Sequence, residues 1–147
     1  MAILKYTFWL KAAAVSQLLT AVFHSLSFVN NPQPGNDTER QLLDLMTNYK
    51  LDLGAGFTHS MKDLMTAFSI SLTLLLLFGG CLNWFLLRKK VESETMRGVI
   101  GINVIIFGGC FAAMTLLTFL PPIICTGLIF ICLLMAYITI LKKQRAQ

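Results

Sequence analysis

The chain has 147 residues, of which 56% are hydrophobic and only 13% are charged, and its net charge is +5. A soluble domain usually carries about 25% charged residues, so this composition excludes an ordinary soluble globular fold. The charges gather in short clusters between long uncharged runs, which predicts an all-α integral membrane protein whose helices face lipid. The basic residues do not form a groove with interleaved aromatic side chains, so we expect no nucleic-acid partner.

The first apolar run covers residues 8–29 and begins close to Lys5 and Lys11. A basic segment followed by an apolar one is also typical of a signal peptide. No small-residue cleavage site precedes the polar segment that follows, so we expect this run to be a retained membrane anchor.

A polar loop, residues 30–62, contains a predicted amphipathic helix at about residues 39–50. Thr38 and Gln41 have the spacing of a capping box at its start. The apolar side chains of this segment recur at the spacing of one helix face: Leu42, Leu45, Met46 and Tyr49. Such a face must rest on the helix bundle, on the lipid surface or on another protein, and we predict a partner surface here.

The second apolar run covers residues 60–87, and residues 60–63 have the spacing of a second capping box. The third and fourth runs, residues 98–120 and 123–141, are separated by two prolines that predict a tight turn. The four runs together predict a single domain. It is a four-helix transmembrane bundle with a short amphipathic helix in the extracytoplasmic loop between the first two spans.

The distribution of Lys and Arg predicts the orientation of these spans. Nine lie in the N-terminal segment, the loop after the second span and the C-terminal segment: Lys5, Lys11, Arg88, Lys89, Lys90, Arg97, Lys142, Lys143 and Arg145. Three lie in the long polar loop: Arg40, Lys50 and Lys62. Cytoplasmic segments carry the excess of positive charge, so both termini should be cytoplasmic. Four spans agree with this, because an even number is required for both termini to share a side.

This outline resembles that of several families of small four-helix membrane proteins, among them the DoxX-like proteins and many bacterial ones. No motif in the chain singles out one of these families, so the resemblance is one of outline only. It implies a multi-pass protein, and we expect its location to be a bacterial plasma membrane.

The tetrapeptide Phe-Gly-Gly-Cys occurs twice, at residues 78–81 and 107–110. The two copies are equidistant from the middle of the connecting loop, so an antiparallel hairpin would place them at equal depth. Small residues allow helix backbones to approach closely in a membrane. We therefore predict that Gly79 and Gly80 pack against Gly108 and Gly109.

Two stripes of polar residues predict a pocket that opens to the outside. They contribute Gln17, Thr20 and His24 from the first span, and His59, Asp63 and Thr66 from the second. Imidazoles and a carboxylate can bind a divalent metal, and two imidazoles can hold haem iron. No metal-binding spacing is present, and hydrated helix ends explain the same residues, so we expect no catalytic residue, no metal ligand and no cofactor.

Three classes of function are compatible with these features. The first is a non-enzymatic accessory subunit or assembly factor of a membrane complex, which binds a protein partner or a second copy through the amphipathic helix. The second is a small-molecule carrier or channel with an outward-opening polar pocket. The third is a membrane enzyme or redox protein that uses His24, His59 and Asp63. We favour the first class, because the apolar face of the amphipathic helix must rest on something. The second class would need polar groups through the whole membrane depth, and the third and fourth spans offer few.

Overall fold

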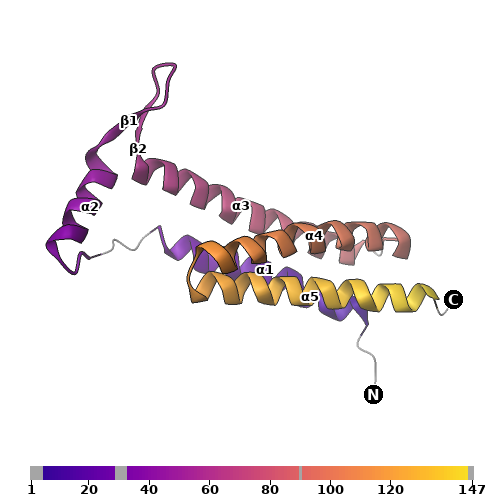
Figure 1. Ribbon diagram of the computed structural model, residues 1–147. Helices are drawn as coiled ribbons and strands as arrows, with labels where there is room; N and C mark the ends of the chain where they lie inside the picture. The colour runs from indigo at the N-terminus through magenta and orange to yellow at the C-terminus, as the bar shows by residue number, and fades with distance from the viewer. Residues whose placement is uncertain (1–4, 29–32, 90, 146–147) are drawn as a thin grey trace. The chain divides into compact units, whose positions relative to one another are not determined.

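The computed structural model describes residues 5–28, 33–89 and 91–145 (Figure 1). Its helices are α1 (Tyr6–Leu26), α2 (Asp37–Asn48), α3 (Met61–Arg88), α4 (Ser93–Leu117) and α5 (Leu120–Arg145), and its strands are β1 (Lys50–Asp52) and β2 (Thr58–Ser60). The end of the first predicted span at Val29, the first residues of the predicted loop (30–32) and Lys90 lie outside the described residues. The prediction of a helical protein is confirmed.

Three helices in the described part of the chain, α3, α4 and α5, are long and apolar enough to cross a membrane. Between 11% and 39% of their most apolar stretches is buried within the protein. Most of this apolar surface therefore needs lipid around it, which supports a membrane protein with transmembrane helices. The predicted count of four spans differs from this finding, because α1 is not among the three. Lys11, Gln17 and His24 lower the apolar character of α1.

The helix boundaries also differ from the predicted spans. α4 begins at Ser93 rather than residue 98, so its charged first turn is helical as well. α5 begins at Leu120, and the two prolines lie in its first turn rather than in the turn before it. The first N–H groups of a helix have no intrahelical partner, so proline is tolerated there. The chain breaks instead at Thr118, whose extended backbone ends α4.

By its internal contacts the chain divides into two compact units, residues 1–20 with 76–147, and residues 21–75. Within the first unit, α4 and α5 lie side by side as an antiparallel helical hairpin (Figure 1). The rings of Phe111 and Phe130 stack across it with their centroids 5.9 Å apart. At its other end Nη1 of Arg97 donates to Oε1 of Gln144 at 2.9 Å.

The part of α1 in the first unit runs antiparallel to the end of α3. Leu10, Ala13 and Ala14 of α1 are fully buried, and the carbonyl oxygen of Ala14 lies next to Gly80 of α3. The ammonium of Lys143, near the end of α5, lies 5.9 Å from the ring centroid of Tyr6. The start of α1 and the end of α5 therefore meet at the same end of this unit.

In the second unit, α2 begins two residues earlier than predicted and has a different cap. Asn36 is the N-cap, and its Oδ1 accepts from the backbone N–H of Glu39 at 2.8 Å. The carboxylate of Glu39 reaches back to the N–H of Gly35 at 2.6 Å. The predicted capping box of Thr38 and Gln41 is therefore wrong. The same reciprocal bonding is made two residues earlier by Asn36 and Glu39, because asparagine is the stronger N-cap.

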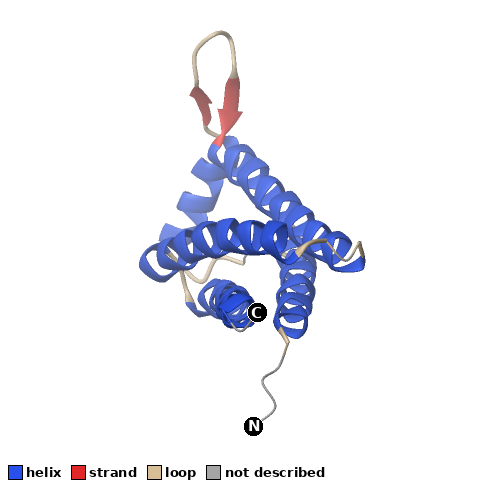
Figure 2. Cartoon of the chain, turned by 90° about the vertical axis from the view of Figure 1, so that its right-hand side faces the viewer, coloured by secondary structure: helices blue, strands red, loops and turns tan. Residues whose placement is uncertain are grey.

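An antiparallel β-hairpin, shown in red in Figure 2, follows α2 and was not predicted. Leu51 pairs with His59 in its register. At its tip Gly54, Ala55 and Gly56 all have positive φ, of 82°, 51° and 84°. Only glycine adopts such angles without steric cost, so these two glycines make the turn possible. The alternating pattern on either side of Gly-Ala-Gly was the available sequence signal.

Candidate functional site

The six residues of the predicted polar pocket divide between the two units. Gln17 and Thr20 belong to the first unit, while His24, His59, Asp63 and Thr66 belong to the second. The residues of each unit are therefore described separately, by the contacts that each side chain makes.

Gln17 is fully buried and bonds to another buried amide. Its Oε1 accepts from Nδ2 of Asn83 at 3.0 Å, and neither side chain is exposed to solvent. No hydrogen-bond partner for Nε2 of Gln17 or Oδ1 of Asn83 lies among the described residues. Gln17 thus lies inside the contact of α1 with α3. Sequence reasoning missed Asn83. Its amide inside the apolar run 60–87 was the available signal, since a polar group in lipid must find a partner inside the protein.

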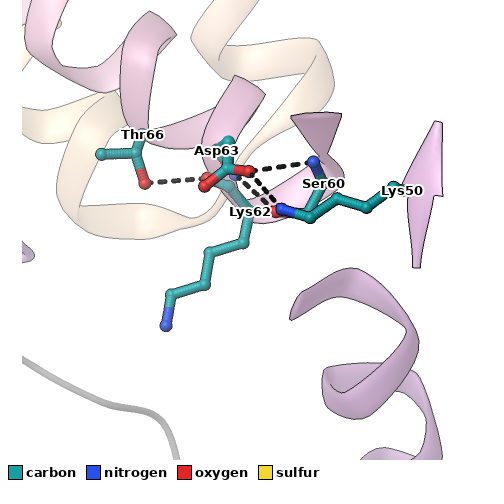
Figure 3. A network of polar contacts seen from close by, with 5 residues as sticks. All are labelled: Lys50, Ser60, Lys62, Asp63 and Thr66. Atoms are coloured by element: carbon teal, nitrogen blue, oxygen red, sulfur yellow. Dashed lines mark hydrogen bonds and ion pairs between the residues drawn. The ribbon is translucent and has the colours of Figure 1, made fainter. Parts of the chain in front are cut away.

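Asp63 caps the start of α3, as the predicted capping box of residues 60–63 requires (Figure 3). The backbone N–H of Ser60 donates to Oδ2 of Asp63 at 2.9 Å, and the N–H of Asp63 donates to Oγ of Ser60 at 3.2 Å. The ammonium of Lys50, from β1, lies 3.2 Å from the same Oδ2. This capping box is therefore confirmed.

The capping contacts also determine the charge of Asp63. The 28 residues of α3 extend about 42 Å, more than the roughly 30 Å of a hydrocarbon core, so we place its polar first turn outside the core. The backbone and side-chain hydrogen bonds from Ser60, followed by that from Lys50, lower the pKa of Asp63 to about 2. The carboxylate therefore stays ionised at any physiological pH, which suits a cap and not a proton donor.

The two histidines have separate surroundings. His24 lies in the last turn of α1, and its ring meets the ring of Phe28 edge-on at 6.0 Å. Its Nε2 is shielded from solvent without a hydrogen-bond partner in the described residues. His59 lies exposed on β2. Among the residues that the structure describes, no group of three His, Cys, Asp or Glu side chains is arranged to hold a metal ion.

Thr20 is half-buried in α1, and Thr66 is exposed on α3. The hydroxyl of Thr66 donates to the backbone carbonyl of Lys62 at 2.8 Å, one turn earlier in the same helix (Figure 3). Bonding of this kind satisfies a hydroxyl locally. Thr66 therefore needs no ligand to complete its hydrogen bonding.

The four predicted packing glycines have different neighbours. A Cβ placed on Gly80 would lie 2.8 Å from Cγ of Leu18, and one on Gly79 would lie 2.9 Å from Nε2 of Gln17, so this pair faces α1. A Cβ on Gly108 would meet the ring of Phe130 in α5 at 3.0 Å. One on Gly109 would meet nothing within 4 Å among the described residues. Gly79 and Gly80 therefore lie against α1, with Phe107 of α4 also 3.7 Å from a Cβ on Gly79, and Gly108 lies against α5, instead of the two pairs facing one another.

Three of the four residues of the predicted partner surface are exposed, and the fourth, Met46, is half-buried. We call Leu42, Leu45, Met46 and Tyr49 the α2 apolar face. Leu42, Leu45 and Tyr49 expose 56%, 59% and 62% of their surface, and no residue of α2 is buried. The neighbouring hairpin tip exposes further apolar side chains, 49% of Leu53 and 63% of Phe57. The second unit thus presents large apolar side chains from two adjacent elements.

The chain matches no protein-family model, no curated protein and no solved structure. Its function therefore has to be inferred from its own residues and contacts.

Proposed function

We propose that this chain is a non-enzymatic accessory subunit or assembly factor of a membrane complex, and that it binds its partner through the α2 apolar face. The observation that carries this proposal is the exposure of that face on a helix with no buried residue. A helix of 12 residues is marginal in water without tertiary contacts. Burying one leucine contributes about 1.5–3 kcal/mol, so a partner that covers this face would stabilise both itself and α2.

The charge of α2 supports a protein partner over the lipid surface. The helix carries Asp37, Glu39 and Asp44 against Arg40, which is three carboxylates and one guanidinium, a net charge of −2. Helices that lie on membranes are typically rich in Lys and Arg, which attract anionic lipids. An acidic helix favours an apolar partner surface with basic residues at its rim. A second copy of the same face would bring like charges together, so we expect a different protein, with its extracytoplasmic segment as the contact.

A pair of charge substitutions on α2 tests this docking surface. Leu45→Asp places a carboxylate on the α2 apolar face, whereas Thr47→Asp places one on the other side of the helix. After purification in mild detergent, Leu45→Asp should retain at least about tenfold less of a stoichiometric partner, because a buried leucine contact is lost and a charge is buried. Thr47→Asp should retain it as the parent chain does.

A photo-crosslinking residue at Leu42 should join the chain to that same partner. Equal retention by the two variants would contradict the proposal. So would a parent chain that yields no stoichiometric partner. A crosslink between two copies of this chain would show that the partner is a second copy, and would contradict the expectation of a different protein.

We further propose that α1 is a fourth span of a multi-pass bundle, that both termini are cytoplasmic, and that the membrane is a bacterial plasma membrane. Its 21 residues extend about 31 Å, close to the thickness of a hydrocarbon core. The contact of Lys143 with Tyr6 supports placing the start of α1 and the end of α5 on one side. The nine-to-three excess of Lys and Arg supports the cytoplasm as that side.

Cysteine labelling of intact cells with an impermeant reagent tests the number of spans. In a background without the four native cysteines, Thr47→Cys should be labelled, while Glu92→Cys and Ala2→Cys should be protected until the membrane is opened. Labelling of Ala2→Cys from outside, with Glu92→Cys still protected, would mean that α1 does not cross. Labelling of Glu92→Cys and protection of Thr47→Cys would reverse the whole orientation.

A further inference from the structure

A small hollow of about 260 Å³ lies between α1 and the end of α3, within the first unit. It is lined by Lys11 of α1 and by Trp84, Leu87 and Arg88 of α3. The volume is sufficient for a phosphate group and part of what it is attached to. The lining combines two cations, an indole and an aliphatic side chain.

Both cations of the hollow lack a carboxylate in the described part of the chain. No ion pair or hydrogen bond joins Lys11 or Arg88 to another described side chain. Arg97, by contrast, has both Glu94 and Gln144 within reach. Two cations that line one hollow repel each other, so an anion between them would stabilise the arrangement.

The position of the hollow corresponds to the level of lipid headgroups. Lys11 lies in the second turn of α1, directly after Leu10, which is fully buried, while Arg88 is the last residue of α3. Trp84 is 40% exposed beside them, and tryptophan is enriched where the hydrocarbon core meets the headgroups. A long Lys side chain from within a span extends towards the same level.

We propose that this hollow binds the phosphate of an anionic phospholipid headgroup. Lys11 and Arg88 contact the phosphate, and Trp84 and Leu87 pack against the start of the lipid's apolar part. Basic pockets between transmembrane helices are suited to anionic headgroups, because they add charge attraction to apolar contact. The site is distinct from the α2 apolar face and does not depend on the partner proposed for it.

Quenching of Trp84 fluorescence by brominated lipids tests the site in the full-length chain. The chain has two tryptophans, so Trp9→Phe leaves Trp84 as the single reporter. The chain is reconstituted into phosphatidylcholine vesicles that contain either brominated phosphatidylglycerol or brominated phosphatidylcholine. We expect the anionic lipid to associate at least about tenfold more strongly. We also expect Lys11→Gln or Arg88→Gln to lower this preference about fivefold each, because each removes a cation that contacts the bound phosphate in the hollow.

Lys89→Gln is the matched control, because it removes a neighbouring cation that lies over the ring of Phe85 and not in the hollow. It should change the preference less than about twofold. An equal loss in Lys89→Gln and Arg88→Gln would overturn the proposal, since general surface charge would then explain the binding. A parent chain with no preference for the anionic lipid would also overturn the proposal. A preference that disappears when inorganic phosphate is added at constant ionic strength would overturn it too, because the hollow would then bind a soluble anion. Unchanged circular dichroism of each variant establishes that it is folded.

Discussion

Gly80→Leu should destabilise the chain in detergent by about 1–3 kcal/mol, because it forces a side chain into a close contact between α1 and α3. A Cβ at this position would lie 2.8 Å from Cγ of Leu18 and 3.1 Å from the carbonyl oxygen of Ala14. The leucine side chain can rotate away, but the carbonyl belongs to the backbone of α1. The two helices must therefore separate, and thermal unfolding followed by circular dichroism should show a lower midpoint.

Gly109→Leu is the matched control for this substitution. It occupies the same position in the second copy of Phe-Gly-Gly-Cys, yet in the described part of the chain a Cβ there meets nothing within 4 Å. Its unfolding midpoint should stay close to that of the parent chain. Equal midpoints for Gly80→Leu and the parent would show that Gly80 is not a close contact. Equal losses for the two variants would show that the loss of glycine, and not the contact, matters.

Asn83→Leu should destabilise the chain by about 1–2 kcal/mol, because it removes the hydrogen-bond partner of a fully buried amide. Gln17 is 0% exposed, and its Oε1 accepts from Asn83 at 3.0 Å. Without Asn83 this amide stays buried and unpaired, which costs more than the net value of the hydrogen bond itself. Equilibrium unfolding in the same detergent measures the change.

The double variant Gln17→Leu/Asn83→Leu separates pairing from packing. It should recover part of the stability lost in Asn83→Leu, because no unpaired amide remains. Asn103→Leu is the control, since Nδ2 of Asn103 bonds only to the carbonyl of Val99 in its own helix. Losses that simply add in the double variant would mean that the two amides are not coupled.

The helical character of the chain could be predicted from its sequence because it depends on local properties. Long uncharged runs leave the backbone no partner other than itself in lipid, so they form helices. The apolar positions at 42, 45, 46 and 49 likewise follow the period of one helix face. α2 contains the first three, and Tyr49 is its C-cap. The boundaries were less accurate at Asn36 and at the two prolines of α5, since both depend on which residue first takes a helical conformation.

The candidate site was less predictable than the fold. The exposure of the α2 apolar face depends on what packs on α2, which no periodicity reveals: β2 contacts this helix, yet no residue of α2 is buried. The β-hairpin requires Gly54, Ala55 and Gly56 to adopt positive φ together, and a Gly-Ala-Gly segment is equally compatible with a plain loop. Asp63 was placed correctly in its capping box because such bonds join residues three apart.

The sequence by itself determined that the chain is mostly helical, that the segments of α3, α4 and α5 are apolar enough for a membrane, and that Ser60 and Asp63 cap a helix. These features arise from hydrophobicity and from bonds between residues a few positions apart. Only the tertiary structure decided that Gln17 bonds to Asn83, that Gly80 faces α1, and that Gly109 faces no residue in the described ranges. Those contacts depend on which helices pair and on how each is rotated about its axis. Lipid is as apolar as the helix surface, so the hydrophobic effect does not select which apolar face meets a neighbour. Close packing between residues far apart in the sequence selects it instead.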